Sequence, residues 1–244
     1  YASWNWKANG AGSANTAGSI NSTVSANTTS GFSIVQYSGN ATAGATVGHG
    51  LGSVPKMVIV KKTNGVKDWN VYHVGMGATK GMYLNLTNAE QTHGNWNNTT
   101  PTNTVFSIGS DDQVNGSGQT YIAYCFADVQ GFSKMGSYTG NGNADGTFVY
   151  TGFKPAFVII KNVDTQASWV MYDNKRNDFN QVDKRLWPDL DSQEYTNVNY
   201  ALDFLSNGFK LRSTNSNFNS SGTSYIYMCF AENPFVATSG TSAI

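Results

Sequence analysis

Short apolar stretches separated by polar turn residues run along the chain, and no stretch keeps a long helical period. Residues 57–61 and 157–161 are continuously apolar and rich in β-branched side chains, which is typical of strands buried on both faces. Turn pairs such as Asn64-Gly65 and Asn207-Gly208 stand between the stretches. The pattern predicts an all-β protein of β-sandwich or jelly-roll type. Further strands are expected at 69–73, 82–86, 104–108, 120–127, 147–153, 168–172, 200–205, 208–211 and 224–231, and residues 181–190 are also compatible with a short helix.

The same pattern occurs twice, about 100 residues apart, which indicates two sequence-related units. Pro55-Lys-Met-Val-Ile-Val-Lys61 returns as Pro155-Ala-Phe-Val-Ile-Ile-Lys161. Other matched positions are Tyr37 and Tyr138, Trp69 and Trp169, Asn115 and Asn219, Gly118 and Gly222, and Cys125 and Cys229.

The repeat divides the chain into five parts. Residues 1–8 have the spacing of the end of the first cysteine-containing strand and are expected to be the last strand of a preceding unit. Residues 9–31 are rich in Gly, Ala, Ser, Asn and Thr and are expected to be a polar linker. The two β units, of about 100 residues each, are expected at 32–134 and 135–236, either separate or sharing one core, with a loose tail at 237–244.

Charge and composition exclude several classes of protein. The formal net charge is zero and charged residues make up 12% of the 244 residues, so the basic surface of a general nucleic-acid binder is missing. No apolar run approaches the ~18 residues of a membrane span, so membrane insertion is not expected. The chain has 28 Asn and abundant Ser, Thr and Gly. A polar surface with few charges depends only weakly on ionic strength, which suits an extracellular or virion-surface protein.

The two cysteines, Cys125 and Cys229, each lie within an apolar run. Buried thiols in strands behave as small hydrophobic groups, and the spacing resembles no metal motif. Two buried thiols are therefore the prediction, and no cofactor is expected.

Several stretches resemble a repeat module of marine bacteriophage structural proteins, a domain of unknown function that often follows a concanavalin-like lectin domain in tail-fibre-type proteins. The resemblance covers the chain from Tyr1 to Phe235 and implies a virion or tail-fibre context without catalytic residues. Its distinctive motifs include Tyr37-Ser-Gly-Asn40, Asp68-Trp-Asn-Val-Tyr-His73, Tyr138-Thr-Gly-Asn141, Tyr172-Asp-Asn-Lys-Arg-Asn177 and Phe230-Ala-Glu-Asn-Pro234.

Catalytic and metal sites find little support in the sequence. Asp68 and His73 suggest part of a catalytic triad, but the second unit has other residues at both positions. Asn141 to Gly146 imitates the start of a calcium loop without its closing Glu, so a hairpin turn is preferred. We therefore expect no catalytic residues and no metal. The acids considered for glycoside cleavage are Asp183, Asp189, Asp191 and Glu194, which are better explained as solvated loop charges.

Glycan binding is the sharpest functional hypothesis, because sugar sites combine an aromatic face with Asn, Asp or Arg side chains. Trp69 and Trp169 are expected in the core instead. The segment 172–177 follows a strand end, and its Tyr and Arg could equally form a subunit interface. The candidates for glycan binding or an interface are Trp96, Asn97, Tyr172, Asp173, Lys175, Arg176 and Trp187.

These observations lead to one functional expectation with two alternatives. We expect a non-enzymatic structural module of a phage virion or tail fibre, located on the virion or outside the cell, that contributes to attachment to host-surface glycans. Exposed strand edges predict a homo-oligomer, a trimer if the protein is a fibre, in contact with other virion proteins. The alternatives are a polysaccharide-degrading tail enzyme and a bacterial surface lectin or filament protein.

Overall fold

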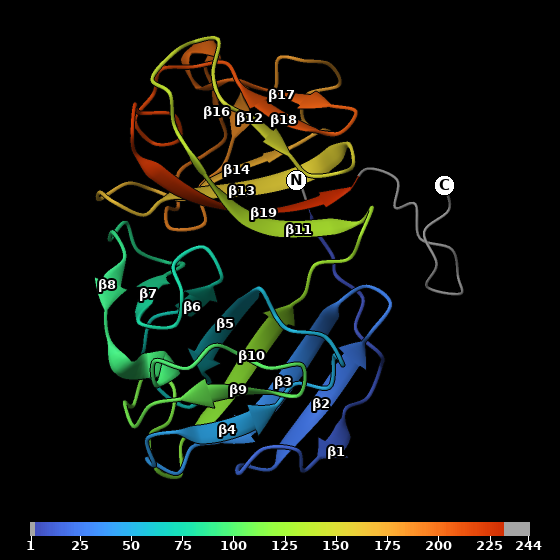
Figure 1. The fold of residues 1–244 in the computed structure, drawn as a ribbon, viewed down its shortest axis with the longest axis vertical. Coiled ribbons are helices and arrows are strands. Elements are labelled where there is room, and N and C mark those ends of the chain that lie inside the picture. Colours follow the sequence, from blue (N-terminus) through green and yellow to red (C-terminus); the bar gives the residue numbers. More distant parts are fainter. Residues whose placement is uncertain (1–2, 232–244) are drawn as a thin grey trace. The chain divides into compact units, whose positions relative to one another are not determined.

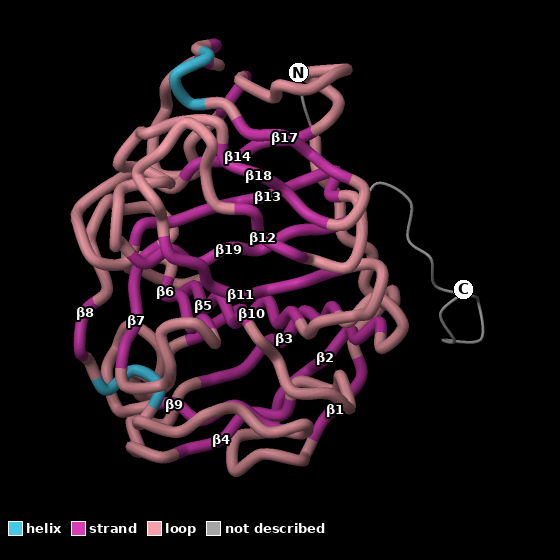
Figure 2. Tube along the Cα trace, turned by 45° about the horizontal axis from the view of Figure 1, so that its top comes forward, coloured by secondary structure: helices cyan, strands magenta, loops and turns pink. Residues whose placement is uncertain are grey.

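The computed structural model describes residues 3–231 and divides into two compact units, each built almost wholly from antiparallel strands (Figures 1 and 2). Unit 1 comprises residues 3–84 and 90–128. Unit 2 comprises the short segment 85–89 together with the described residues from 129 onward. Within this part of the chain the helical structure is two short turns, η1 (Gly94–Trp96) and η2 (Val198–Tyr200).

Unit 1 is a β-sandwich whose larger sheet has eight strands in the order β1-β2-β3-β10-β5-β6-β7-β8. A smaller sheet, β4-β9, packs against it. The strands are β1 (Ser13–Asn15), β2 (Ser22–Asn27), β3 (Phe32–Ser38), β4 (Ala45–Gly48), β5 (Met57–Lys62), β6 (Asn70–His73), β7 (Lys80–Tyr83), β8 (Gln91–Thr92), β9 (Val105–Ile108) and β10 (Thr120–Phe126).

Unit 2 has three sheets, with strand orders β11-β19-β13-β14, β12-β18-β17 and β15-β16. The first two sheets face each other across the core. The strands are β11 (Ser133–Thr139), β12 (Phe148–Tyr150), β13 (Pro155–Asn162), β14 (Val170–Asp173), β15 (Lys184–Arg185), β16 (Tyr195–Thr196), β17 (Leu202–Leu205), β18 (Gly208–Leu211) and β19 (Ser224–Ala231).

Each unit has its own hydrophobic core, so the alternative of one shared core is wrong. In unit 1, Val58 and Val60 of the larger sheet meet Phe106 and Ile108 of the smaller one. The core of unit 2 joins the side chains of β13 and β19 to those of β12, β17 and β18. All-β architecture and the sandwich type are as the hydrophobic pattern predicts, because continuously apolar strands require cover on both faces.

The matched sequence positions lie at matched positions in the two units. β3-β10-β5-β6 and β11-β19-β13-β14 have the same strand order, and β4-β9 corresponds to β12-β18. Tyr37 stacks on Tyr121 with ring centroids 5.2 Å apart, and Tyr138 stacks on Tyr225 at 5.1 Å. Descent of both units from one duplicated ancestor stays a prediction from the sequence.

A fully buried asparagine ties two loops together in each unit. Asn115 accepts a hydrogen bond from the backbone N–H of Asn40 at 2.9 Å and donates to the carbonyls of Thr42 and Gly109 at 3.0 and 2.7 Å. In unit 2, Asn219 makes the same kind of contacts to the loop that begins at Asn141. A buried amide with all its polar atoms bonded fixes the two loops it joins.

Several boundaries predicted from sequence are wrong. Residues 9–31 are not a linker, since they contain β1 and β2, which extend the large sheet of unit 1 beyond β3. Ile20 and Val24 are buried in this segment. The Ser25 hydroxyl accepts the Asn9 N–H and donates to the Gly10 carbonyl, so small polar side chains help to hold a packed strand here.

The first residues also differ from the expectation. Residues 3–8 form no strand, and Asn27 donates to the carbonyl of Lys7 within unit 1. Residues 1 and 2, the end of the expected second unit at 232–236 and the expected tail at 237–244 lie outside the described residues. Along the chain, unit 1 ends at Asp128 and unit 2 resumes at Val129, earlier than the predicted 134/135 boundary. The short helix considered at 181–190 is absent, and these residues form β15 and its flanking loops.

Cys125 and Cys229 form no disulfide, and both thiols are buried as predicted. Burial raises the pKa of Cys125 to about 12, so its thiol stays protonated at neutral pH.

Candidate functional site

The loop after β14 in unit 2 begins with a turn that a buried carboxylate caps. Asp173 is the last residue of the strand, and its Oδ1 accepts the backbone N–H groups of Lys175 and Arg176, both at 2.9 Å. Asp side chains favour such turns because they replace the missing backbone acceptor. The turn carries the following residues out of the sheet.

Arg176 and Asn177 brace the loop against the segment that returns. The Arg176 guanidinium donates to Asp173 Oδ2 at 2.6 Å and to Glu194 Oε2 at 3.2 Å. The Asn177 amide donates to Asp183 Oδ1 at 3.0 Å and accepts the backbone N–H of Lys184 at 2.9 Å. Side chains in charge-assisted bonds of this kind hold their geometry in advance of any ligand.

Asn180 fixes the tip of the loop to strand β17. Its amide donates to the Phe204 carbonyl and accepts the Phe204 N–H, both at 2.9 Å, as a neighbouring strand would. Two residues further on, Val182 forms an antiparallel bridge with Leu202 of the same strand. The loop is therefore anchored at both ends and at its tip.

The anchored loop encloses a hollow of about 220 Å³ on unit 2. This is smaller than the ~300–1,000 Å³ of sites for drug-sized ligands, so it suits a single ring-sized group. The lining residues are Lys154, Asn174, Asn177, Asp178, Phe179, Asn180, Val182 and Phe204.

The lining includes an exposed aromatic ring, an exposed carboxylate and a buried amide oxygen. Phe179 is 84% exposed, which is unusual for a large apolar side chain beside a hollow. Asp178 is exposed at the same edge. The buried Oδ1 atom of Asn174 has no hydrogen-bond partner among the residues the structure describes. A ring face, a carboxylate and an amide whose bonding is incomplete are groups that bind polar ring compounds.

A second cluster lies beside this loop, where Arg185 is surrounded by aromatic rings. Its guanidinium carbon lies 3.1 Å from the ring centroid of Tyr200, 4.7 Å from that of Tyr195 and 4.9 Å from that of Trp187. Arg185 is buried, and the ring faces help to stabilise its charge. Trp187 and Tyr195 are thereby fixed with part of their surfaces toward solvent.

Of the seven residues predicted from sequence, four lie in or beside this loop with different roles. Tyr172 is fully buried, and its hydroxyl donates to the Tyr200 carbonyl at 2.6 Å, so its prediction as a glycan contact is wrong. Asp173 and Arg176 position the loop, as described above. Lys175 is exposed and remains a candidate contact.

The other predicted residues are divided between the units. Trp96 is 1% exposed and packs edge-to-face on Tyr72, so an open Trp96 is wrong. Asn97 ends η1 in the left-handed region at φ 48° and is a turn residue. Trp187 remains a candidate because it is partly exposed. Trp169 is buried as expected, whereas Trp69 is half-buried and stacks on Tyr124.

The sequence reasoning missed Phe179 and Asn180, and it named the segment 172–177 without choosing Asn174 as a candidate. Their signal is a difference between the two units. The residues after β6 are Val74-Gly-Met-Gly-Ala78, while those after β14 are Asn174-Lys-Arg-Asn-Asp178. The turn itself is shared, since His73 Nδ1 accepts the Gly75 N–H at 3.0 Å where Asp173 caps its own turn. The polar loop is thus a feature of unit 2.

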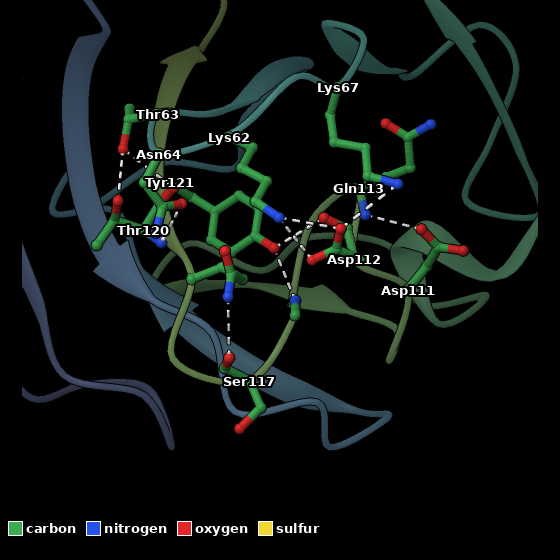
Figure 3. A network of polar contacts seen from close by, with 12 residues as sticks. Lys62, Thr63, Asn64, Lys67, Asp111, Asp112, Gln113, Ser117, Thr120 and Tyr121 are labelled. Atoms are coloured by element: carbon green, nitrogen blue, oxygen red, sulfur yellow. Dashed lines mark hydrogen bonds and ion pairs between the residues drawn. The ribbon is translucent and has the colours of Figure 1, made fainter.

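A charged cluster in unit 1 serves the fold. Figure 3 shows Lys62 and Lys67 converging on Asp112, with Nζ–Oδ distances of 2.9 and 3.4 Å. The pKa of Asp112 is lowered, and the hydrogen bond from Lys62 is the main cause. Tyr121 donates to the Asp112 carbonyl at 2.8 Å, so the cluster holds the loop before Asn115.

The acids considered for glycoside cleavage either form bonds with other residues or lie outside the lining of the hollow. Asp183 accepts Asn177, and Glu194 pairs with Arg176. Burial raises the pKa of Asp189, whose Oδ1 accepts the Trp169 N–H at 3.0 Å. Asp145 of the calcium-like turn pairs with Lys210 at 2.9 Å. Among residues 3–231, no three His, Cys, Asp or Glu side chains are placed to hold a metal ion.

Within the same residues, no helix has the length and apolar character to cross a membrane.

Comparison with known proteins gives one match. A family model described as "Domain of unknown function (DUF7483)" matches residues 1–234. Neither the curated proteins nor the solved structures contain a match to the chain.

Proposed function

The chain belongs to the family described as Domain of unknown function (DUF7483), and because that description carries no activity, we propose a function from the site itself: attachment to glycans by a non-enzymatic structural module. The hollow beside the loop of residues 174–182 is the binding site. The sequence resemblance to marine bacteriophage structural proteins supports a virion or tail-fibre location outside the cell, with host-surface glycan as the ligand.

The observation that carries the proposal is Phe179, held 84% exposed at the edge of a preformed polar hollow. The anchors at Asn177 and Asn180 fix the loop, so little conformational entropy is lost when a ligand binds. A sugar ring can stack on Phe179 while its hydroxyls donate to Asp178.

The size of the hollow sets the expected strength of binding. About 220 Å³ accommodates one sugar ring, so a single site should bind weakly. Weak sites become effective when several are joined, because later binding events are intramolecular. This supports a homo-oligomer, a trimer if the module forms part of a fibre with other virion proteins.

The test measures binding of the full chain to purified host-envelope polysaccharides and to a glycan array. We expect Phe179→Ala to weaken binding about two- to tenfold, because an aromatic stacking contact contributes ~0.5–1.5 kcal/mol. Asp178→Asn should also weaken it. Val66→Ala is the matched control, since Val66 is a 99% exposed apolar residue in unit 1. Equal binding by all three variants would rule out this hollow.

The same preparations distinguish the enzyme alternative. Release of reducing ends from a polysaccharide, abolished by Asp183→Asn or Asp191→Asn, would show a polysaccharide-degrading tail enzyme and overturn the non-enzymatic proposal. Binding with no turnover supports attachment. Genes for capsid and tail proteins beside the coding sequence would separate a phage module from a bacterial surface lectin or filament protein.

A further inference from the structure

Strand β12 forms an edge of its sheet in unit 2 and carries two exposed aromatic side chains. The sheet order β12-β18-β17 leaves one side of β12 open. Phe148 is 43% exposed and Tyr150 is 64% exposed, while Val149 between them is buried in the core. The opposite edge, β17, is covered by Asn180 and Val182.

The backbone groups on the open side of β12 have no strand partner in the described part of the chain. The Val149 carbonyl points toward β18, since a Cβ placed on Gly208 would lie 2.1 Å from it. Alternate residues in a strand direct their N–H and C=O groups to opposite sides, so those of Phe148 and Tyr150 point outward. Within residues 3–231 these outward groups have no hydrogen-bond partner. Such an edge is a template for an added strand.

Unit 1 shows what this kind of edge accepts. Strand β4, which corresponds to β12, is covered along its open side by residues 18–22 of the chain. Ile20 donates its N–H to the Thr46 carbonyl at 3.0 Å and forms a parallel bridge with Val47. The Thr46 N–H donates to Ser19 Oγ at 2.9 Å.

The covering segment needs a glycine at one position. Gly18 lies so close to β4 that a Cβ on it would meet the Thr46 carbonyl oxygen at 2.3 Å. The Gly-Ser-Ile order of residues 18–20 is therefore matched to the edge: Gly for close approach, Ser for the outward N–H, and Ile for pairing beside the core.

Unit 2 has no counterpart of this segment in the described chain. Strand β11 starts at Ser133, four residues after unit 2 resumes at Val129, so no hairpin like β1-β2 precedes it. We propose that the open edge of β12 binds an extended, uncharged polypeptide segment of the Gly-Ser-Ile type, supplied by another polypeptide. The segment adds a parallel strand to β12, and Phe148 and Tyr150 contact its flanking residues.

The test uses a peptide of residues 16–23 with blocked ends, titrated into isotope-labelled full-length chain and followed by amide shifts. We expect saturable shifts at Phe148, Val149 and Tyr150. A peptide with Gly18→Ala should bind at least tenfold more weakly, because its methyl group would strike the Phe148 carbonyl. The chain variant Phe148→Pro should lose binding to a similar degree, because it lacks the outward N–H yet keeps the β18 ladder.

The outcomes are separable. Unchanged shifts elsewhere in the Phe148→Pro spectrum show that the variant folds, and Tyr150→Lys provides a second edge variant if it does not. Equal binding of both peptides, shifts confined to β4, or no binding at millimolar peptide would overturn the proposal. Self-association that Phe148→Pro abolishes, without peptide binding, would also overturn it and assign the edge to a second copy of the chain.

Discussion

Removing the buried amide of Asn219 should destabilise unit 2 strongly. The Asn219 amide donates to the Ser213 carbonyl at 2.7 Å and the Asn143 carbonyl at 2.8 Å, and accepts the Asn141 N–H at 3.1 Å. In Asn219→Ala the Ser213 carbonyl stays buried without a donor, while Asn141 and Asn143 are exposed enough to bond water. One fully orphaned group costs ~1–3 kcal/mol, and with the loss of the remaining bonds we expect about 2–4 kcal/mol.

The assay is urea unfolding combined with hydrogen exchange of β19 and β10, which report unit 2 and unit 1 separately. Asn219→Ala should weaken protection in β19 with little effect on β10, and Asn115→Ala should do the reverse. Asn219→Asp is the sharper variant. In this variant a carboxylate oxygen replaces the amide nitrogen and faces the same carbonyl oxygens. The folded state therefore favours the protonated acid, and the free energy of unfolding should fall as pH rises above about 4. A loss under 1 kcal/mol in Asn219→Ala, or no added pH dependence in Asn219→Asp, would refute the assigned role.

Three further predictions follow from burial and charge. Burial lowers the pKa of Lys161 to about 8, so above that pH the unfolded chain binds more protons than the folded chain. The free energy of unfolding, measured in urea, should therefore rise by at most about 2 kcal/mol between pH 8 and 9.5. Lys161→Met should abolish this rise. Trp169→Ala should cost ~3–5 kcal/mol and half-buried Trp69→Ala clearly less, by the same unfolding assay; equal losses would contradict the burial difference. Asp112→Asn should lower stability only slightly, and the loss should shrink in 1 M salt, because the carboxylate is solvated and its ion pairs are screened.

The all-β class and most strand positions follow from the sequence because apolar strands between Gly and Asn turns have few alternatives. β18 and β19 lie where the pattern places them. The strands β1 and β2 were missed because Ser, Thr and Asn dominate them, and Val24 is the one large apolar side chain that they contain. Polar strands like these are stabilised by their neighbours, which a single sequence does not show.

The site was located in part. The sequence indicated the polar segment after β14 as a candidate, but it assigned Tyr172 and Trp96 to the surface although both are core residues. An aromatic residue beside polar neighbours gives the same local signal whether it faces inward or outward. The difference between the two units marks this segment in the sequence, but the exposure of Phe179 depends on the anchors at Asn177 and Asn180, which are tertiary contacts.

In the loop after β14, the residues that hold the backbone in place differ from those that are exposed to solvent. Asp173, Asn177 and Asn180 make the side-chain bonds that shape it, while the side chains of Lys175, Asp178 and Phe179 are exposed. Replacements at the exposed positions therefore carry little folding penalty, and natural selection is able to alter them one at a time. A lineage that must follow a changing receptor gains from such an arrangement, because new preferences arise by single steps through variants that all remain viable.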